Sequence, residues 1–149
     1  MVDSKEKGSR AETLVKNTLK KYTGLAFERT PLSGALDAKH GLKSDIYIPN
    51  EKNIYAIEVK HYKEDHISSK VLTNKDPQLL LFWKQAVREA EETNKKPLLI
   101  FKFDRSKLFV AFREFPKKDY SHMFITAQGL DFFVAVLDDW LINEKPKFI

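Results

Sequence analysis

The stretch that decides the fold reads Ser44-Asp45-Ile46-Tyr47-Ile48-Pro49-Asn50-Glu51-Lys52-Asn53-Ile54-Tyr55-Ala56-Ile57-Glu58-Val59-Lys60. Two runs rich in Ile, Tyr and Val flank a turn-forming segment, which predicts strands over 44–48 and 54–60. So short a connection predicts an antiparallel hairpin. Because side chains alternate between the two faces of a strand, Glu58 and Lys60 share one face. The pairing is expected to bring the Asp45 carboxylate within a few ångströms of Glu58.

Two adjacent carboxylates beside a lysine indicate a metal site that acts on phosphate. Two carboxylates this close repel each other unless a cation lies between them. Oxygen ligands without His or Cys favour Mg²⁺, with Mn²⁺ as a substitute, over Zn²⁺. Such an ion assists phosphodiester hydrolysis, and Lys60 could stabilise the transition state or position the water. The alternatives are an ion pair of Glu58 with Lys60 on a solvated sheet edge, and a turn role for Asp45.

Towards the N-terminus, the sequence predicts a helix, a short strand and a loop. Apolar residues at helical spacing predict the helix over about Ser9 to Tyr22, and Gly24 ends it. The strand is expected over Ala26 to Arg29. Turn residues then predict a loop from Thr30 to Lys43.

Towards the C-terminus, a polar stretch from His61 to Lys75 precedes a second helix. Asp76 suits the N-cap of that helix and Pro77 its first position, and Phe82 and Trp83 belong to its apolar, core-facing side. Further strands are expected over 97–102, 108–113 and, at a sheet edge, 123–126. Apolar residues from Leu130 to Leu141 predict a last helix, which begins after Gly129. This order predicts one α/β domain over residues 1–149, with a mixed central β-sheet flanked by helices.

Composition limits the class of protein. The 149 residues include no cysteine, which excludes disulfide scaffolds, zinc ribbons and thiol catalysis and fits a reducing, intracellular location. No apolar run approaches the roughly 20 residues needed to cross a bilayer, so no membrane partner is expected. The first residues are charged and carry no signal-peptide core. The net charge of +5 favours polyanionic partners such as nucleic acid.

The pattern of Asp45, a hairpin and then Glu58-x-Lys60 resembles the signature of the PD-(D/E)XK nuclease superfamily, whose fold is restriction-endonuclease-like. The segments 8–12 (Gly-Ser-Arg-Ala-Glu) and 29–35 (Arg-Thr-Pro-Leu-Ser-Gly-Ala) resemble the entry motif and the serine loop of archaeal-type Holliday junction resolvases. Gln85 matches a glutamine found on the following helix in many nucleases of this fold. The resemblance covers roughly residues 5 to 113, so the C-terminal helix is expected to be an addition private to this chain. Ser44 stands where the motif name has proline.

The resemblance implies a role for each matching residue. Asp45, Glu58 and the carbonyl of Val59 would ligate Mg²⁺, and Glu12 would complete the acidic site directly or through a water. Lys60 would act on the attacking water or the transition state, and Gln85 would position Lys60 or the phosphate. Arg10 and Ser33 would contact the DNA backbone or support catalysis. Further contacts to the DNA backbone are expected from Lys16, Arg29, Lys39 and Lys43, because these residues lie near the proposed site.

The implied activity is a structure-selective endonuclease that resolves four-way DNA junctions in recombination and repair. A homodimer is implied, because a two-fold symmetric pair offers one active site to each of two opposed strands. The protein would act in the cytoplasm, that of a host cell if a phage encodes it. The alternatives are a nuclease of the same fold that cuts duplex or flapped DNA, and a non-catalytic DNA-binding domain.

Two local interpretations compete with these roles. Ser9-x-x-Glu12 is also a capping box, in which Glu12 would satisfy the amide of the N-cap residue. The histidines at 40, 61 and 66 are expected to lie in loops, either solvated or beside phosphate.

Overall fold

The hairpin predicted around Asp45 is present in the computed structural model, which describes residues 4–31 and 44–149. Strand β2 (Ile46–Tyr47) pairs antiparallel with β3 (Tyr55–Tyr62), with Ile46 opposite Ile57. In the turn, the Asn53 side chain accepts a hydrogen bond from the Ile48 amide at 2.8 Å and donates one to the Ile48 carbonyl at 2.9 Å. This side chain fixes the register of the hairpin, which confirms the central prediction.

The described strands form one seven-stranded mixed sheet in the order β1-β2-β3-β4-β5-β7-β6. The remaining strands are β1 (Glu28–Arg29), β4 (Lys96–Phe103), β5 (Phe109–Phe112), β6 (Met123–Ala127) and β7 (Leu130–Val136). Among these pairings only β3 and β4 run parallel. A parallel pair needs a crossover, and a helix makes it here.

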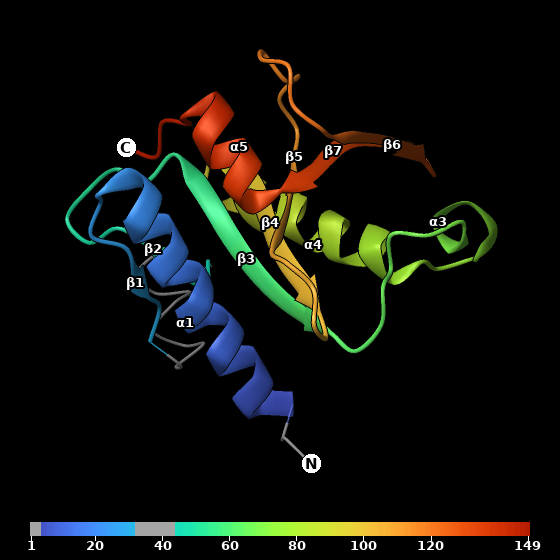
Figure 1. The fold of residues 1–149 in the computed structure, drawn as a ribbon, viewed down its shortest axis with the longest axis horizontal. Helices are drawn as coiled ribbons and strands as arrows, with labels where there is room; N and C mark the ends of the chain where they lie inside the picture. Colours follow the sequence, from blue (N-terminus) through green and yellow to red (C-terminus); the bar gives the residue numbers. More distant parts are fainter. Residues whose placement is uncertain (1–3, 32–43) are drawn as a thin grey trace.

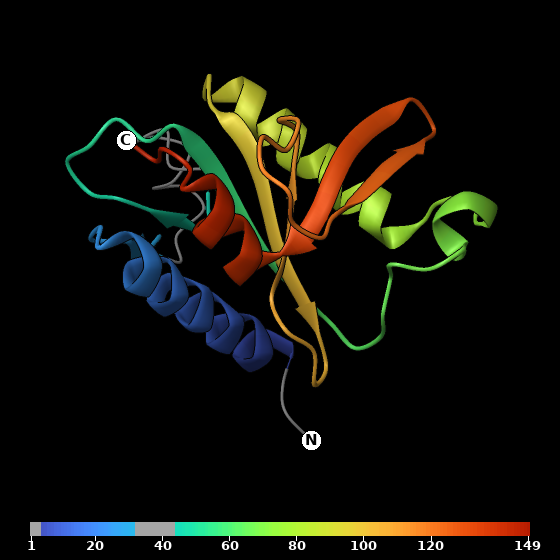
Figure 2. The ribbon, with the colours of Figure 1, turned by 45° about the horizontal axis from the view of Figure 1, so that its top comes forward.

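Helices cover both faces of the sheet (Figures 1 and 2). Helices α1 (Ser4–Thr23) and α5 (Leu137–Glu144) lie against one face, and α1 contacts β3 while α5 contacts β5 and β7. Helix α4 (Gln78–Glu92) makes the crossover and lies on the other face against β3 and β4, preceded by the short α3 (Lys70–Thr73). The α/β architecture predicted from the sequence is therefore confirmed.

The core is divided between the two faces because side chains alternate along each strand. On β4, Leu98 and Ile100 join the cluster under α1 and α5, whereas Leu99 and Phe101 join the cluster under α4. All four of these side chains are fully buried. The same alternation turns the face of β3 that carries Glu58 towards α4, where a charged residue is unexpected.

One prediction about the last third of the chain, the helix over Leu130 to Leu141, was wrong over its first half. Residues 130–136 form strand β7, and the helix begins only at Leu137. The apolar spacing fits a helix, but Gln128 and Gly129 have φ of 50° and 78°, which suits a tight hairpin turn between β6 and β7. Both faces of β7 are buried, so the two-residue period typical of a strand is hidden.

Helix boundaries also differ from expectation. Helix α1 begins at Ser4, and the polar stretch after β3 includes α3. Pro77 is the N-cap of α4 and no side chain caps it, so the capping role predicted for Asp76 is wrong. In the described part of the chain, no helix is long and apolar enough to cross a membrane.

Candidate active site

The hairpin places Asp45 beside β3. The Asp45 amide donates to the Ile57 carbonyl at 2.8 Å, and its Oδ2 accepts a hydrogen bond from the Val59 amide, also at 2.8 Å. One carboxylate oxygen is therefore held against the backbone of the strand that carries Glu58. Burial raises the pKa of Asp45, although the hydrogen bonds from Val59 and Glu58 and the Lys60 ammonium oppose this.

Glu58 lies almost wholly inside the protein, with 5% of its surface exposed. Burial raises its pKa well above the ordinary value, and contacts with the carboxyls of Glu89 and Asp45 raise it further. Its Oε1 is buried and has no hydrogen-bond donor among the described residues. A buried carboxylate oxygen without a donor is costly unless it is protonated or bound to a cation.

Glu89, on α4, was missed by the sequence analysis. Its Oε1 accepts a hydrogen bond from Gln85 Nε2 at 3.3 Å, while Oε2 is buried and has no donor among the residues described. It contacts Glu58 and so adds a carboxylate to the acidic cluster. The available signal was its position four residues after Gln85, which places both side chains on one helix face. Gln85 contacts Glu89 in this structure.

Glu12 reaches the same region from α1. Arg29 on β1 donates a hydrogen bond from Nε to Glu12 Oε1 at 3.2 Å, and its Nη2 forms an ion pair with the same oxygen at 3.2 Å. Burial and then the nearby Asp45 raise the pKa of Glu12, whereas Arg29 and Lys60 lower it. The capping-box interpretation is wrong, because the residue proposed as the N-cap, Ser9, lies within α1 and accepts a hydrogen bond from Thr13 Oγ1 at 3.1 Å.

Lys60 completes the cluster from the same face of β3 as Glu58. Its Nζ lies 4.8 Å from the centre of the Phe82 ring, which stacks on Tyr62 with ring centres 5.3 Å apart. Phe82 therefore makes a cation–π interaction with Lys60 in addition to packing against Tyr62. Trp83 is buried as predicted and stacks on Phe132.

The donor set suits a hard divalent cation. In residues 4–31 and 44–149, no three carboxylates or histidines converge closely enough to hold a metal on their own. A site made of Asp45, Glu58 and a backbone carbonyl needs only two side chains, and Glu12 would then act through a water. The buried, donor-free oxygens of Glu58 and Glu89 fit a cation, because an ion would neutralise them together.

The predicted DNA contacts differ in how the structure places them. Arg10 is exposed on α1 and Lys16 is half-buried. Arg29 is engaged with Glu12, which makes it part of the acidic site. Ser33, Lys39 and Lys43 lie outside the described residues, as does His40. His61 was expected in a loop but lies in β3.

An acidic pair on a β-hairpin, a lysine two residues on, and a mixed sheet between helices define the PD-(D/E)XK class of nucleases. Residues 3–149 match the family described as "Phage putative PDDEXK endonuclease", and the chain belongs to this family. The match extends to the C-terminus, so the last helix is not a private addition. The nuclease class predicted from Asp45, Glu58 and Lys60 is confirmed.

Two known proteins are similar over most of their length. "Protein D14" of Escherichia phage T5 is 40% identical over 148 residues, which cover 94% of this chain and 92% of that protein. The second is Hjc, a Holliday junction resolvase from Archaeoglobus fulgidus, whose structure aligns with a TM-score of 0.43 and 18% sequence identity. The alignment covers 96% of this chain and 92% of the Hjc chain.

Proposed function

We propose that this protein is a Mg²⁺-dependent endonuclease that resolves four-way DNA junctions, and that residues 1–149 form a single nuclease domain. The observation that carries the metal site is the Asp45 carboxylate, held by the Val59 amide next to the buried Glu58. The preference for junctions is supported by the likeness of segments 8–12 and 29–35 to resolvase motifs. The lack of cysteine supports action inside a cell.

Asp45, Glu58 and the Val59 carbonyl would hold Mg²⁺, or Mn²⁺ in its place. When bound, such an ion would orient the scissile phosphate, lower the pKa of the attacking water and neutralise the charge on the departing oxygen. Lys60 stabilises the negative charge that develops on the phosphate, because its ammonium lies on the same strand face as Glu58. Arg29 orients Glu12 and favours its ionised form, and Glu12 would accept a hydrogen bond from water at the edge of the site.

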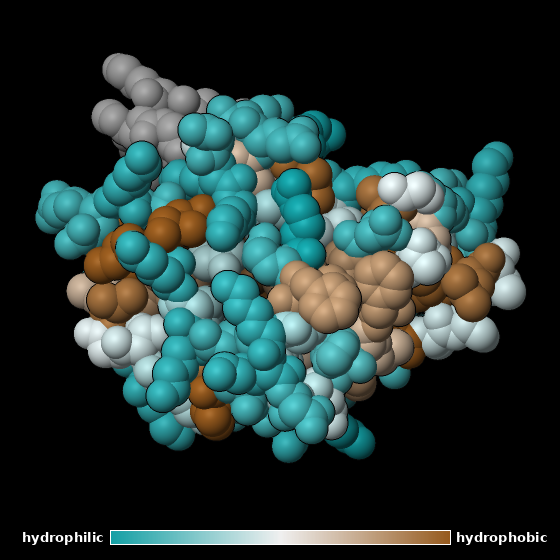
Figure 3. All heavy atoms as spheres, turned by 90° about the horizontal axis from the view of Figure 1, so that it is seen from above, coloured by the Kyte–Doolittle hydropathy of each residue, from teal (hydrophilic) through white to brown (hydrophobic). Residues whose placement is uncertain are grey.

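A homodimer is supported by the edge of the sheet at β6. In the described residues, β6 pairs with β7 on one side only, and it contains no charged residue. Its Met123 and Phe124 are exposed, and so is Leu72 across a hollow of about 500 Å³ between α3 and β6. In Figure 3, apolar side chains gather towards the right of the view, on the side of the molecule where α3 and β6 lie. Because an uncharged, apolar edge invites pairing with another chain, β6 is the proposed dimer contact.

Cleavage of matched substrates tests this function. Labelled four-way junction, linear duplex and flap DNA are incubated with the protein and either Mg²⁺ or EDTA. We expect symmetric cleavage of the junction that requires the metal, abolished by Lys60→Met and retained by Lys52→Met, a matched change in the exposed turn of the same hairpin. Cleavage of duplex or flap DNA alone would overturn the junction preference, and binding without any cleavage would indicate a non-catalytic domain.

A further inference from the structure

A second charged site lies on the opposite face of β3 from Glu58. A hollow of about 260 Å³ is lined by Lys7, Arg10, Ala11 and Leu14 of α1, His61 of β3 and Lys102 of β4. Four of these six residues carry, or can carry, a positive charge. Strand alternation places His61 and Lys102 on the face that α1 covers. Helix α1 and two parallel strands thus direct basic groups to one point.

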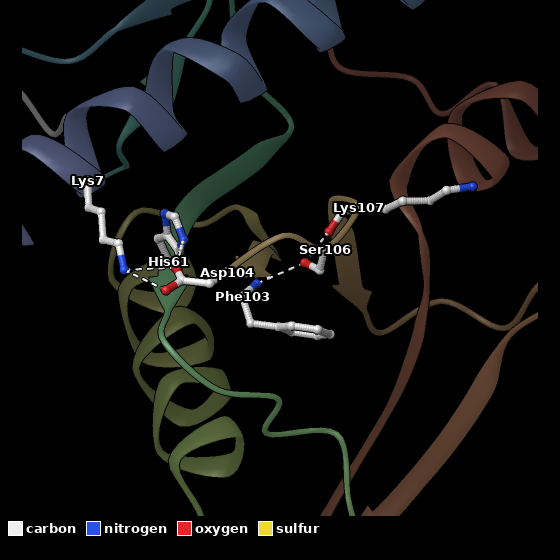
Figure 4. Close-up of polar contacts among 6 residues, drawn as sticks. All are labelled: Lys7, His61, Phe103, Asp104, Ser106 and Lys107. Atoms are coloured by element: carbon white, nitrogen blue, oxygen red, sulfur yellow. Dashed lines mark hydrogen bonds and ion pairs between the residues drawn. The ribbon is translucent and has the colours of Figure 1, made fainter. Parts of the chain in front are cut away.

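A single carboxylate holds two of these groups in place. Asp104 follows β4, and its Oδ1 and Oδ2 lie 2.8 and 3.0 Å from Lys7 Nζ. His61 Nε2 lies 2.8 Å from Asp104 Oδ1. Figure 4 shows the Lys7 and His61 side chains directed towards Asp104. The His61 side chain is only 13% exposed, so this contact orients it firmly. The hydrogen bond from Lys7, followed by that from His61, lowers the pKa of Asp104, which stays ionised.

The charges do not cancel within this set. Asp104 contributes one negative charge, whereas Lys7 and Lys102 together contribute two positive charges. The hollow therefore keeps a net positive charge, and its lysine and histidine are already positioned. Preorganised cations around a small cavity suit a compact polyanion such as a phosphate group, because little entropy is lost on binding.

The hollow and the proposed catalytic site lie on opposite faces of the same stretch of β3. His61 directly follows Lys60 on β3, and Arg10 precedes Glu12 on α1 by two residues. In the described part of the chain, β2 pairs with β3 only at Ile57, so no strand flanks residues 59–62 on the side away from β4. A nucleic-acid strand that follows this edge would pass the acidic cluster and then the hollow.

We propose that this hollow binds a backbone phosphate of the DNA on one flank of the cleaved bond, through Lys7, Arg10, His61 and Lys102. The proposal rests on the proposed function. It deepens that function by assigning an anchoring subsite for a phosphodiester separate from the metal site. Asp104 acts as a positioning residue that orients Lys7 and His61.

The test is the salt dependence of DNA binding in the absence of a metal. Each phosphate contact contributes about 0.9 to the slope of log K against log salt on duplex DNA. Fluorescence anisotropy with labelled junction and duplex would compare the intact chain with Lys102→Gln, Lys7→Gln and the double variant. The matched control is Lys107→Gln, an exposed lysine whose side chain points away from the Lys7–Asp104 pair (Figure 4).

We expect the double variant to bind several-fold more weakly with a slope lower by about 1, and the control to match the intact chain. Asp104→Asn should weaken binding at low salt, because Lys7 and His61 lose the carboxylate that orients them, whereas a purely structural role predicts a lower thermal midpoint with unchanged binding. An unchanged slope in the double variant, or an equal change in Lys107→Gln, would overturn the subsite. If the subsite is overturned in this way but Lys60→Met still abolishes cleavage, the proposed nuclease function is unaffected. If the intact chain binds no DNA at all, the proposed function itself fails.

Discussion

Replacing Glu58 by Gln should abolish cleavage and yet stabilise the metal-free protein at neutral and alkaline pH. Glu58 is 5% exposed, and burial, Glu89 and Asp45 all raise its pKa. In the unfolded chain this carboxyl ionises near pH 4.5, the ordinary value for glutamate. The unfolded chain therefore loses the proton first as the pH rises. The free energy of unfolding should fall from about pH 4.5 upward, until the pH reaches the raised pKa of the folded protein.

The size of this effect follows from linkage. Each pH unit inside that window removes about 1.4 kcal/mol. Between pH 6 and pH 8, Glu58 alone should remove up to about 3 kcal/mol of the free energy of unfolding of the metal-free protein. For a chain of this size that corresponds to a fall of roughly 10 °C in the thermal midpoint. Glutamine has nearly the same shape and cannot ionise, so Glu58→Gln should lose this part of the pH dependence.

Thermal unfolding in EDTA at pH 6 and pH 8 measures the effect, with junction cleavage followed in parallel. Mg²⁺ should raise the midpoint of the intact protein at pH 8, because the ion replaces the proton as the neutralising charge, and should do much less for Glu58→Gln. Glu51→Gln, in the exposed turn of the same hairpin, is the control. If Glu58→Gln loses as much stability between pH 6 and pH 8 as the intact protein, the buried carboxyl is not the cause. If the variant cuts at the normal rate, the site is wrongly placed.

Three more changes probe other parts of the structure. Glu89→Gln should raise the Mg²⁺ concentration for half-maximal cleavage several-fold, because it removes a carboxylate that contacts Glu58; Glu91→Gln on the same helix should not, as a metal titration would show. Gly129→Ala should lower the free energy of unfolding by about 1 kcal/mol in urea titration, because its φ of 78° disfavours any side chain although the space is open; a midpoint equal to that of the intact chain would contradict the strained turn. Phe124→Asp should shift the protein from dimer to monomer in light scattering, whereas a change at the exposed position Ile142 of α5, Ile142→Asp, should not; an intact Phe124→Asp dimer would exclude the β6 contact.

The hairpin was predictable because its signals are local. Short-range periodicity, turn residues and strand alternation together determine where Asp45 and Glu58 lie. The run from Leu130 to Val136 was misassigned because both of its faces are buried. Apolar side chains at consecutive positions then satisfy a helical period as well as a strand.

Glu89 and Asp104 could not be recognised from their neighbours in sequence. A glutamate in a helix that also carries Lys84 and Arg88 has the pattern of a solvated face. Its burial against Glu58 is a product of the β3–α4–β4 crossover, which no local pattern encodes. The contacts of Asp104 with Lys7 and His61 likewise join distant segments, with Lys7 separated from it by 97 positions.

The acidic cluster draws on both layers of helices, since Glu12 comes from α1 and Glu89 from α4. A chain that has formed the hairpin but has not yet docked both helices would hold Asp45, Glu58 and Lys60 in open water. Nuclease competence should then appear only in the last step of folding, together with burial of the core. A substitution that loosens the packing of α1 or α4, even far from the bound phosphate, should therefore abolish cleavage under conditions in which the sheet is still folded.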